Sequence, residues 1–204
     1  MVNVEAKQYE TFTDLLRDKA SVITHPIARW LSKWNVHPNT ITIAGFLLTA
    51  GAGIVLATGH LSWGGALLLL TSSTDALDGA LARVTGKKSR FGAFLDSTVD
   101  RFSEGALLFG LLVWQLQVGH ALEVYLIFLS LLGAVMVSYT RARAEGVGYA
   151  CKVGMLTRAP RVFLLGVGLL LGLVRPTLIL LAVLSWITVL QRILHVYRES
   201  RQIP

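Results

Sequence analysis

The chain has few charged residues and almost no cysteine, and both shortages restrict what it can be. Only 15% of its 204 residues are charged and 53% are hydrophobic, whereas soluble domains average about 25% charged residues. The single Cys151 excludes a disulfide framework and a zinc site built from cysteines. No polar linker is long enough to separate two domains, and the first 35 residues show no apolar core of a cleavable signal peptide. We therefore expect one polytopic membrane domain.

Apolar runs of about 20 residues predict an all-α membrane protein with six transmembrane helices. A boundary after residue 37 separates an amphipathic segment, 1–37, from the six-helix domain, 38–204. The predicted spans are residues 39–58, 62–82, 92–115, 121–142, 160–174 and 176–195.

Residues 1–37 are predicted to contain a helix that lies in the membrane interface. Apolar side chains recur there at helical spacing among charged ones, and tryptophans such as Trp30 and Trp34 suit the headgroup level. The alternative is a helix packed on the cytoplasmic ends of the spans.

The lysines and arginines indicate the orientation. The short connections 57–61, 115–121 and 172–177 contain one cation, Arg175, while the opposite side carries the basic loops and both termini. The positive-inside rule makes that basic side cytoplasmic, so we expect an integral protein of the cell membrane with both termini and the active site inside. Anionic membrane lipids are the expected partner of this face. Nucleic acid is not expected.

Four aspartates give the clearest indication of function. Asp75 and Asp78 end one predicted span and are three residues apart, while Asp96 and Asp100 begin the next and are four apart. Each pair shares a helix face, and the short connection 84–91 makes the helices antiparallel neighbours. Carboxylates near a bilayer are costly unless a metal, counter-ion or water compensates them. The group is a candidate site, against the alternative of interfacial acids paired with loop cations.

The chemistry of this group favours a metal ion. An all-oxygen set without cysteine or histidine prefers Mg²⁺ or Mn²⁺ over zinc, and two such ions commonly steady the oxygens of a phosphoryl displacement. Gly79 and Gly92 leave the backbone open to a bulky ligand. Arg83 is suited to holding a phosphate.

The same stretch carries a resemblance. Residues 75–100 match D-x2-D-G-x2-A-R-x8-G-x3-D-x3-D without departure, and this pattern is similar to the signature of the CDP-alcohol phosphotransferases. That family transfers a substituted phosphate from a CDP-linked lipid to an alcohol and releases CMP. The resemblance implies a transferase of phospholipid synthesis whose catalytic domain is 38–204.

The resemblance also implies roles for individual residues. Asp75, Asp78 and Asp96 would ligate two Mg²⁺ ions, or Mn²⁺, with Asp100 close to them. Asp100 would also be the general base that takes the proton of the acceptor hydroxyl. The CDP-lipid would be bound by Asp78, Gly79, Ala82, Arg83 and Gly92. Ser89 is near enough in sequence to add a hydroxyl contact.

A second group of cations narrows the acceptor. The stretch S-Y-x-x-A-R-A-E at 138–145 and the Gln-Arg pair at 191–192 resemble the phosphatidylinositol-phosphate synthase branch, whose members bind inositol phosphate with a serine and several arginines. Two acids of that branch are replaced here by Thr157 and Pro160, and a lysine by Arg141. The resemblance implies that inositol 1-phosphate is bound by Ser138, Arg141, Arg143, Arg158 and Arg192.

Several alternatives stay open. Glycerol 3-phosphate, which would give phosphatidylglycerol phosphate, also needs a basic pocket. The donor is CDP-diacylglycerol or its ether analogue. An ion transporter is disfavoured because the acids lie at a membrane edge and not at the midplane, and a non-catalytic scaffold because no motif aspartate is missing. A homodimer is the habit of the family, and Gly105, Gly110 and Gly133 would permit close packing.

Overall fold

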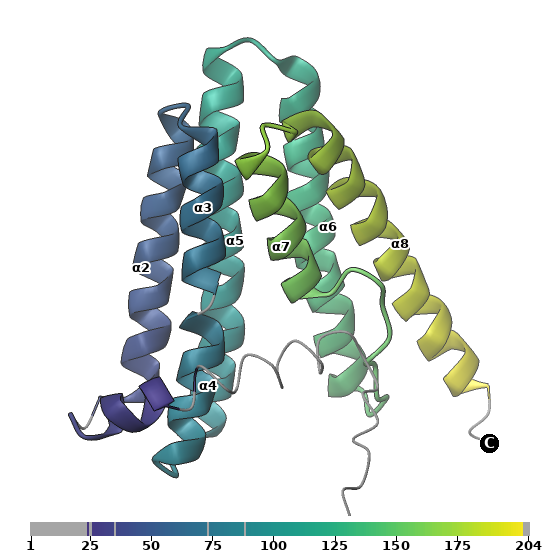
Figure 1. Ribbon diagram of the computed structural model, residues 1–204. Helices are drawn as coiled ribbons and strands as arrows, with labels where there is room; N and C mark the ends of the chain where they lie inside the picture. The colour runs from purple at the N-terminus through teal and green to yellow at the C-terminus, as the bar shows by residue number, and fades with distance from the viewer. Residues whose placement is uncertain (1–23, 25, 35, 73, 88, 202–204) are drawn as a thin grey trace, which may run out of the picture.

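The computed structural model describes residues 24–201 except 25, 35, 73 and 88, and the side chains of 74–76 and 78 also lie outside the described part. The described residues are helical and contain no strand. The helices, labelled in Figure 1, are α2 (Pro38–Ala57), α3 (Leu61–Ser72), α4 (Thr74–Val84), α5 (Arg90–Gln117), α6 (Ala121–Gly146), α7 (Arg158–Leu170) and α8 (Val174–Ser200).

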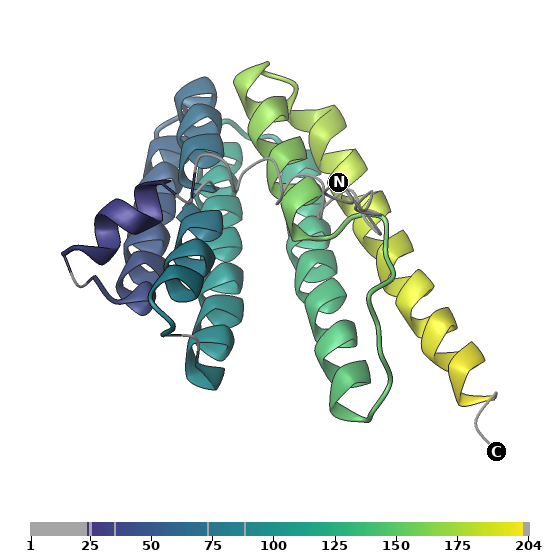
Figure 2. The same ribbon diagram turned by 60° about the horizontal axis from the view of Figure 1, so that its bottom comes forward.

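The helices form two groups that pack side by side. In the first group α2 contacts α3, α4 and α5, and in the second α8 contacts α6 and α7. The groups are joined where α3 packs on α7 and α5 packs on α6. Figure 2 shows the same two groups from another side, with α8 diverging from its neighbours toward the C-terminus. The shared core is aliphatic and includes Leu56, Leu107, Leu111, Leu169 and Leu178.

Glycines allow the closest helix crossings. A Cβ on Gly110 of α5 would overlap the carbonyl of Gly53 of α2, and a Cβ on Gly133 of α6 would lie 2.9 Å from the Cβ of Ser185 of α8. Gly110 and Gly133 therefore serve packing within the chain, and the expectation that they permit packing between subunits is wrong. A Cβ on Gly105 would meet no atom within 4 Å.

Among the described residues, α2, α6 and α8 are long and apolar enough to cross a membrane, and they correspond to three of the six predicted spans. Predicted span 62–82 is described as two helices, α3 and α4, on either side of residue 73. Helix α7 has 13 residues, or about 20 Å at 1.5 Å per residue, against a hydrocarbon core of about 30 Å. Helix α5 has 28 residues, but its first half carries the charged residues of the candidate site.

The end of the amphipathic segment is partly described. Residues 26–32 are helical, and Ala28 is fully buried against Ala80 and Leu81 of α4. On the outer side Trp30 and Trp34 are 57% and 71% exposed, with ring centroids 6.0 Å apart. One face of this helix thus packs on α4 while its tryptophans point outward. Residues 1–23 of the predicted segment lie outside the described residues.

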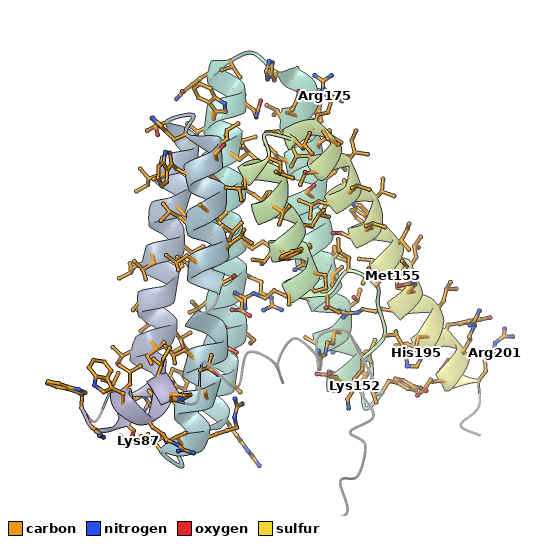
Figure 3. The ribbon with its side chains drawn as sticks, viewed as in Figure 1. Lys87, Lys152, Met155, Arg175, His195 and Arg201 are labelled. Carbon is orange, nitrogen blue, oxygen red and sulfur yellow. The ribbon has the colours of Figure 1, made fainter. Side chains whose placement is uncertain are left out.

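The cations are distributed as the sequence predicts. In Figure 3, Arg175 lies at the end of the molecule where α7 turns into α8, and Lys87, Lys152 and Arg201 lie toward the opposite end. Arg175 itself is paired with Glu123, with 2.7 Å between Nε and Oε1. The described basic residues therefore favour one end of the helix bundle.

Candidate active site

Asp100 lies between two arginines. It is the first buried residue of α5, with 8% of its surface exposed. Its Oδ1 is 2.8 Å from Nη2 of Arg158, and its Oδ2 is 3.3 Å from Nη1 of Arg101. Arg158 begins α7, so an ion pair joins the two helix groups at this carboxylate.

A second ion pair lies one helical turn deeper. Arg161 of α7 donates from Nε to Oε1 of Glu104 at 2.6 Å and from Nη2 to Oε2 at 2.9 Å. The bond between Arg161 and Glu104 is therefore bidentate, a geometry for which guanidinium and carboxylate are matched. Arg161 is 3% exposed and also donates to the carbonyl of Leu156 at 3.3 Å.

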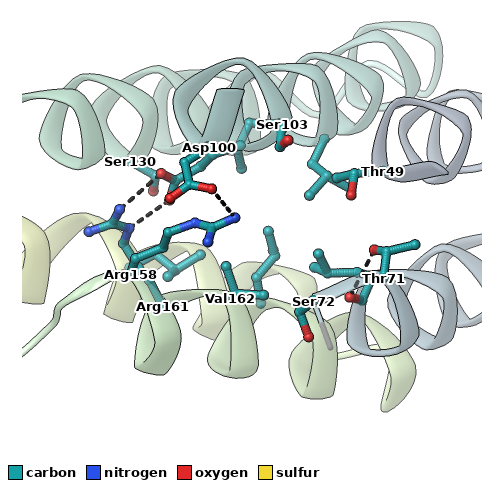
Figure 4. A pocket seen from close by; sticks show the side chains of 15 residues that line it. Thr49, Thr71, Ser72, Asp100, Ser103, Ser130, Arg158, Arg161 and Val162 are labelled. Atoms are coloured by element: carbon teal, nitrogen blue, oxygen red, sulfur yellow. Dashed lines mark hydrogen bonds and ion pairs between the residues drawn. The ribbon is translucent and has the colours of Figure 1, made fainter. Parts of the chain in front are cut away.

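A cavity of about 30 Å³ lies beside these ion pairs. Its polar lining, seen in Figure 4, includes Thr49, Thr71, Ser103 and Ser130 in addition to the charged residues. The rest of its lining is aliphatic, with residues such as Leu107 and Val162, and a space of this volume has room for a water molecule but not for a substrate. Any substrate must therefore reach Asp100 from outside this cavity.

Ser138 of α6 belongs to the same cluster. Arg101 donates from Nη2 to Oγ of Ser138 at 2.8 Å. Arg192 of α8 is 3% exposed, and its Nη1 donates to the carbonyl of Val137, next to Ser138. The structure thus brings together three predicted site residues, Asp100, Ser138 and Arg158, and places Arg192 behind Ser138.

Side chains of α8 hold the segment 147–157 that precedes α7. Arg192 donates from Nε to the carbonyl of Val153 at 2.9 Å, and the backbone N–H of Leu156 donates to Oγ1 of Thr188 at 3.0 Å. The N–H of Met155 donates to Oε1 of Gln191 at 3.1 Å. A hollow of about 470 Å³ lies over this contact. These bonds fix where α7 begins, and with it the position of Arg158.

We expect Arg192→Gln to lower the thermal stability of the purified protein. The substitution leaves the carbonyls of Val137 and Val153 without their donor, and an unsatisfied buried acceptor costs about 1–3 kcal/mol. The melting temperature in detergent measures this, with Arg198→Gln, an exposed cation six residues on, as the matched control. An unchanged melting temperature for Arg192→Gln would show that these bonds do not hold the segment.

Cys151 lies in the same segment and is fully buried. Burial raises the pKa of its thiol, so at any given pH less of it is the thiolate that reacts with alkylating reagents. We expect Cys151 in the folded protein to react with iodoacetamide at pH 8 at least about 100-fold more slowly than a cysteine at exposed position 152, placed there by Lys152→Cys in a Cys151→Ser background. Equal rates would contradict the packing of this segment.

The other predicted site residues lie on α4, at the start of α5 and at the end of α6. The side chains of Asp75 and Asp78 lie outside the described residues. Ser89 is the N-cap of α5 and accepts from the N–H of Gly92 at 2.9 Å, which is a local structural role. A Cβ on Gly92 would lie 3.2 Å from Oδ1 of Asn39, so this glycine permits a close approach of α2.

The remaining predicted residues differ in exposure. Asp96 and Ala82 are half-buried, whereas Arg83 and Arg143 are exposed. Among the described side chains, a Cβ on Gly79 would meet only the tip of Arg83, at 3.6 Å. Arg141 is exposed and bonded to Glu145 at 2.8 Å. The structure does not bring Arg141 or Arg143 into direct contact with the Asp100 cluster.

The donor chemistry at the start of α5 fits a hard divalent ion. Asp96 and Asp100 are one turn apart on the same helix face, and they offer carboxylate oxygens alone. In the part of the chain that the structure describes, no three histidine, cysteine or acidic side chains gather as a metal site. Any further side-chain ligand would come from outside the described part of the chain, to which the predicted ligands Asp75 and Asp78 belong.

Two site residues were not predicted. Glu104 and Arg161 carry no signature of their own, but their spacing was a usable signal. Glu104 follows Asp100 by four residues and Arg161 follows Arg158 by three, so each lies on the same helix face as a predicted site residue. Arg101, which follows Asp100 directly in the sequence, also belongs to the cluster and lies between Asp100 and Ser138.

Comparison with known proteins identifies the family to which the chain belongs. Residues 35–194 match the family model described as CDP-alcohol phosphatidyltransferase. The archaetidylinositol phosphate synthase of Pyrococcus horikoshii is 38% identical over 179 residues, which cover 87% of this chain and 93% of that protein.

Solved structures agree in sequence and in fold. The phosphatidylinositol phosphate synthase of Mycobacterium tuberculosis with CDP-DAG bound superposes with a TM-score of 0.81 at 33% identity, covering 86% of this chain and 94% of that one. The same enzyme in complex with manganese and citrate gives a TM-score of 0.79 at 33% identity, with 85% and 88% covered.

Proposed function

Because this chain belongs to the CDP-alcohol phosphatidyltransferase family, we propose that it transfers a phosphatidyl group from a CDP-linked lipid to inositol 1-phosphate and releases CMP. The observation that carries the proposal is the cluster of Asp100, Arg158, Arg101 and Ser138. It places a carboxylate next to two guanidinium groups and a hydroxyl, which is the set needed for an alcohol that also carries a phosphate. Inositol phosphate synthases among the relatives support this acceptor.

Asp100 is the proposed general base. As the anionic partner of two ion pairs it is a carboxylate, the form that accepts a proton. When the acceptor hydroxyl attacks the phosphorus of the CDP-lipid, its proton passes to Oδ1 or Oδ2 of Asp100, and the bond to CMP breaks. A positioned base of this kind contributes typically 10²–10⁴-fold to the rate.

The acceptor phosphate is proposed to bind at Arg158, Arg101 and Ser138. Arg158 and Arg101 keep 26% and 33% of their side chains exposed, so their donors are accessible from the cytoplasmic side. Arg141 and Arg143 lie nearer the end of α6 and attract the anion by charge. Arg192 acts here by holding the carbonyls beside Ser138 and before α7.

The proposed metal ligands are Asp75, Asp78, Asp96 and Asp100, with two Mg²⁺ or Mn²⁺ ions. When bound, the ions offset negative charge on the pyrophosphate and on the departing CMP. Manganese in the structure of the mycobacterial enzyme supports a divalent ion of this type. The nucleotide is proposed to lie along Gly79, Ala82, Arg83, Ser89 and Gly92.

The membrane arrangement completes the proposal. In this proposal residues 38–204 form the catalytic domain with six spans. The helix of residues 26–32 lies at the cytoplasmic interface, and both termini are cytoplasmic. The placement of Lys87, Lys152 and Arg201 at one end supports this orientation. We also propose a homodimer, for which Gly105 and the exposed Phe102 and Phe109 of α5 provide a close-packing face.

The product lipid tests the proposal. Purified protein in detergent is incubated with inositol 1-phosphate, Mg²⁺ and either CDP-diacylglycerol or its ether analogue, and lipids are identified by mass. We expect phosphatidylinositol phosphate or its ether counterpart, together with one CMP per lipid. CMP without a new inositol lipid would indicate hydrolysis of the donor and would contradict the proposed transfer.

A further inference from the structure

We infer that the buried pair of Glu104 and Arg161 positions Arg158 against Asp100, and so acts on the reaction without touching the substrate. The inference rests on the proposed function for its catalytic consequence, but its geometric part can be measured separately. It concerns two residues to which the sequence motif assigns no role.

The first observation is the register of the two ion pairs. Helices α5 and α7 run in the same direction (Figure 1). Glu104 is four residues beyond Asp100 and Arg161 three beyond Arg158, so each step is about one turn. The two ion pairs therefore connect α5 to α7 at successive helical turns. We call Glu104–Arg161 the inner pair and Asp100–Arg158 the outer pair. The position of α7 along α5 that forms the inner pair also aligns the outer pair.

The second observation is that side chains, and not backbones, connect these helices. Helix α7 packs closely on α3 and α8, and α5 on α2 and α6, but α5 and α7 are not among the closely packed pairs. The cavity of about 30 Å³ lies between them. Long side chains bridge this space, so their ion pairs determine how the first turn of α7 faces α5.

The third observation is that the two ion pairs differ in exposure and in hydrogen bonding. Arg161 is 3% exposed and makes two bonds to Glu104 and one to the carbonyl of Leu156. Its orientation is fixed and its donors face the protein. Arg158 keeps 26% of its side chain exposed, and its Nη2 lies 2.8 Å from Oδ1 of Asp100. The inner pair is therefore suited to fixing α7 against α5, and the outer pair to contact with a ligand.

The fourth observation is electrostatic. Two arginines in the first turn of α7 oppose the helix dipole, which favours anions at an N-terminus. The carboxylates of Asp100 and Glu104 offset this arrangement from the neighbouring helix. Without Glu104 the buried Arg161 loses its counter-charge, so we expect the first turn of α7 to shift and Arg158 to leave Asp100.

The geometric part is tested by a double-mutant cycle on stability. The variants Asp100→Asn and Arg158→Gln, alone and combined, are compared by melting temperature in two backgrounds. One is the wild-type protein, and the other carries both Glu104→Leu and Arg161→Met in place of the inner pair. Replacing a buried ion pair by apolar residues is often neutral or stabilising, so this background should fold. We expect a non-additive shift in the wild-type background, as for residues in contact, and additive shifts without the inner pair.

If the apolar pair does not fold, Glu104→Gln takes its place, because the amide keeps the shape and one bond to Arg161. Non-additive shifts of equal size in both backgrounds would overturn the inference. This comparison needs no turnover, so it decides the positioning role even if wild-type protein releases no CMP. The latter result would overturn the proposed function alone.

Kinetics test the consequence for the reaction. In the background without the inner pair, we expect the KM for inositol 1-phosphate to rise at least about 10-fold, with the donor KM within about 3-fold. In an Arg158→Gln background the same pair of substitutions should change the acceptor KM by less than about 3-fold, since coupled residues are non-additive. Equal factors for both substrates, or in both backgrounds, would mean general destabilisation and would contradict the inference.

Discussion

Asp100→Asn is expected to reduce kcat for CMP release by at least about 10³-fold, the middle of the 10²–10⁴-fold range for a general base. The amide keeps the size of the carboxylate but cannot accept the acceptor's proton. It also removes the anion that Arg158 and Arg101 contact at 2.8 Å and 3.3 Å. Quenched-flow or steady-state assays of CMP measure the effect.

The same variant should still bind the CDP-lipid, because the proposed nucleotide site lies along α4 and the start of α5. The matched control is Glu199→Gln, which makes the same chemical change at a more exposed carboxylate of α8 and should leave turnover unchanged. An Asp100→Asn protein that keeps most of its activity would remove Asp100 as the base. Loss of CDP-lipid binding together with turnover would point to a role in binding.

Removal of divalent metal is expected to abolish CMP release. The motif offers only carboxylate oxygens, and such a cluster of anions near a membrane needs cations for both stability and chemistry. EDTA in excess should lower the rate to background, and Mg²⁺ or Mn²⁺ should restore it. The control is EGTA with Mg²⁺ present, which sequesters Ca²⁺ in preference and should leave the rate intact.

A variant separates a metal at this site from a general ionic effect. Asp96→Asn removes one proposed ligand, and we expect the Mn²⁺ concentration for half-maximal rate to rise at least about 10-fold. Loss of a group that merely supports a metal ligand already costs about 10–100-fold in metal affinity or activity. Full activity after exhaustive chelation would contradict the proposed metal centre. An Asp96→Asn protein with an unchanged metal requirement would remove Asp96 from the ligands.

Much of the site could be predicted because its chemistry conflicts with its surroundings. Carboxylates such as Asp96 and Asp100 are costly in an apolar sequence, so their helical spacing is readable without a structure. The contact of Arg158 with Asp100 was not readable in the same way. It joins residues 58 positions apart through the packing of α7 against the rest of the bundle, and Arg158 was predicted as a ligand of the acceptor alone.

The helix boundaries show where hydropathy fails. The apolar run 160–174 predicts a span, but α7 ends at Leu170 because Gly172 has a φ of 71° and closes the helix with its N–H on the carbonyl of Leu169. Its first turn is likewise set by hydrogen bonds from α8 to segment 147–157. A scale of transfer free energies contains neither effect.

The buried pair of Glu104 and Arg161 shows a further limit. Each residue alone resembles an ordinary charge near a membrane boundary, and the pairing across 57 residues depends on the arrangement of helices. Similarly, Gly110 and Gly133 carry the small-residue pattern of a helix interface, but the sequence does not state whether the partner helix is in the same chain. The structure places both against helices of this chain.

The most direct test of the account compares acceptors. Purified protein with CDP-diacylglycerol and Mg²⁺ is offered inositol 1-phosphate, glycerol 3-phosphate and unphosphorylated inositol in parallel, and CMP release is followed. We expect release with inositol 1-phosphate and not with the other two, because the arginines beside Asp100 are proposed to bind the acceptor's phosphate and relatives of this chain include inositol phosphate synthases. Release with glycerol 3-phosphate alone, or equal release with free inositol, would contradict the proposed acceptor and the arginine pocket on which it rests.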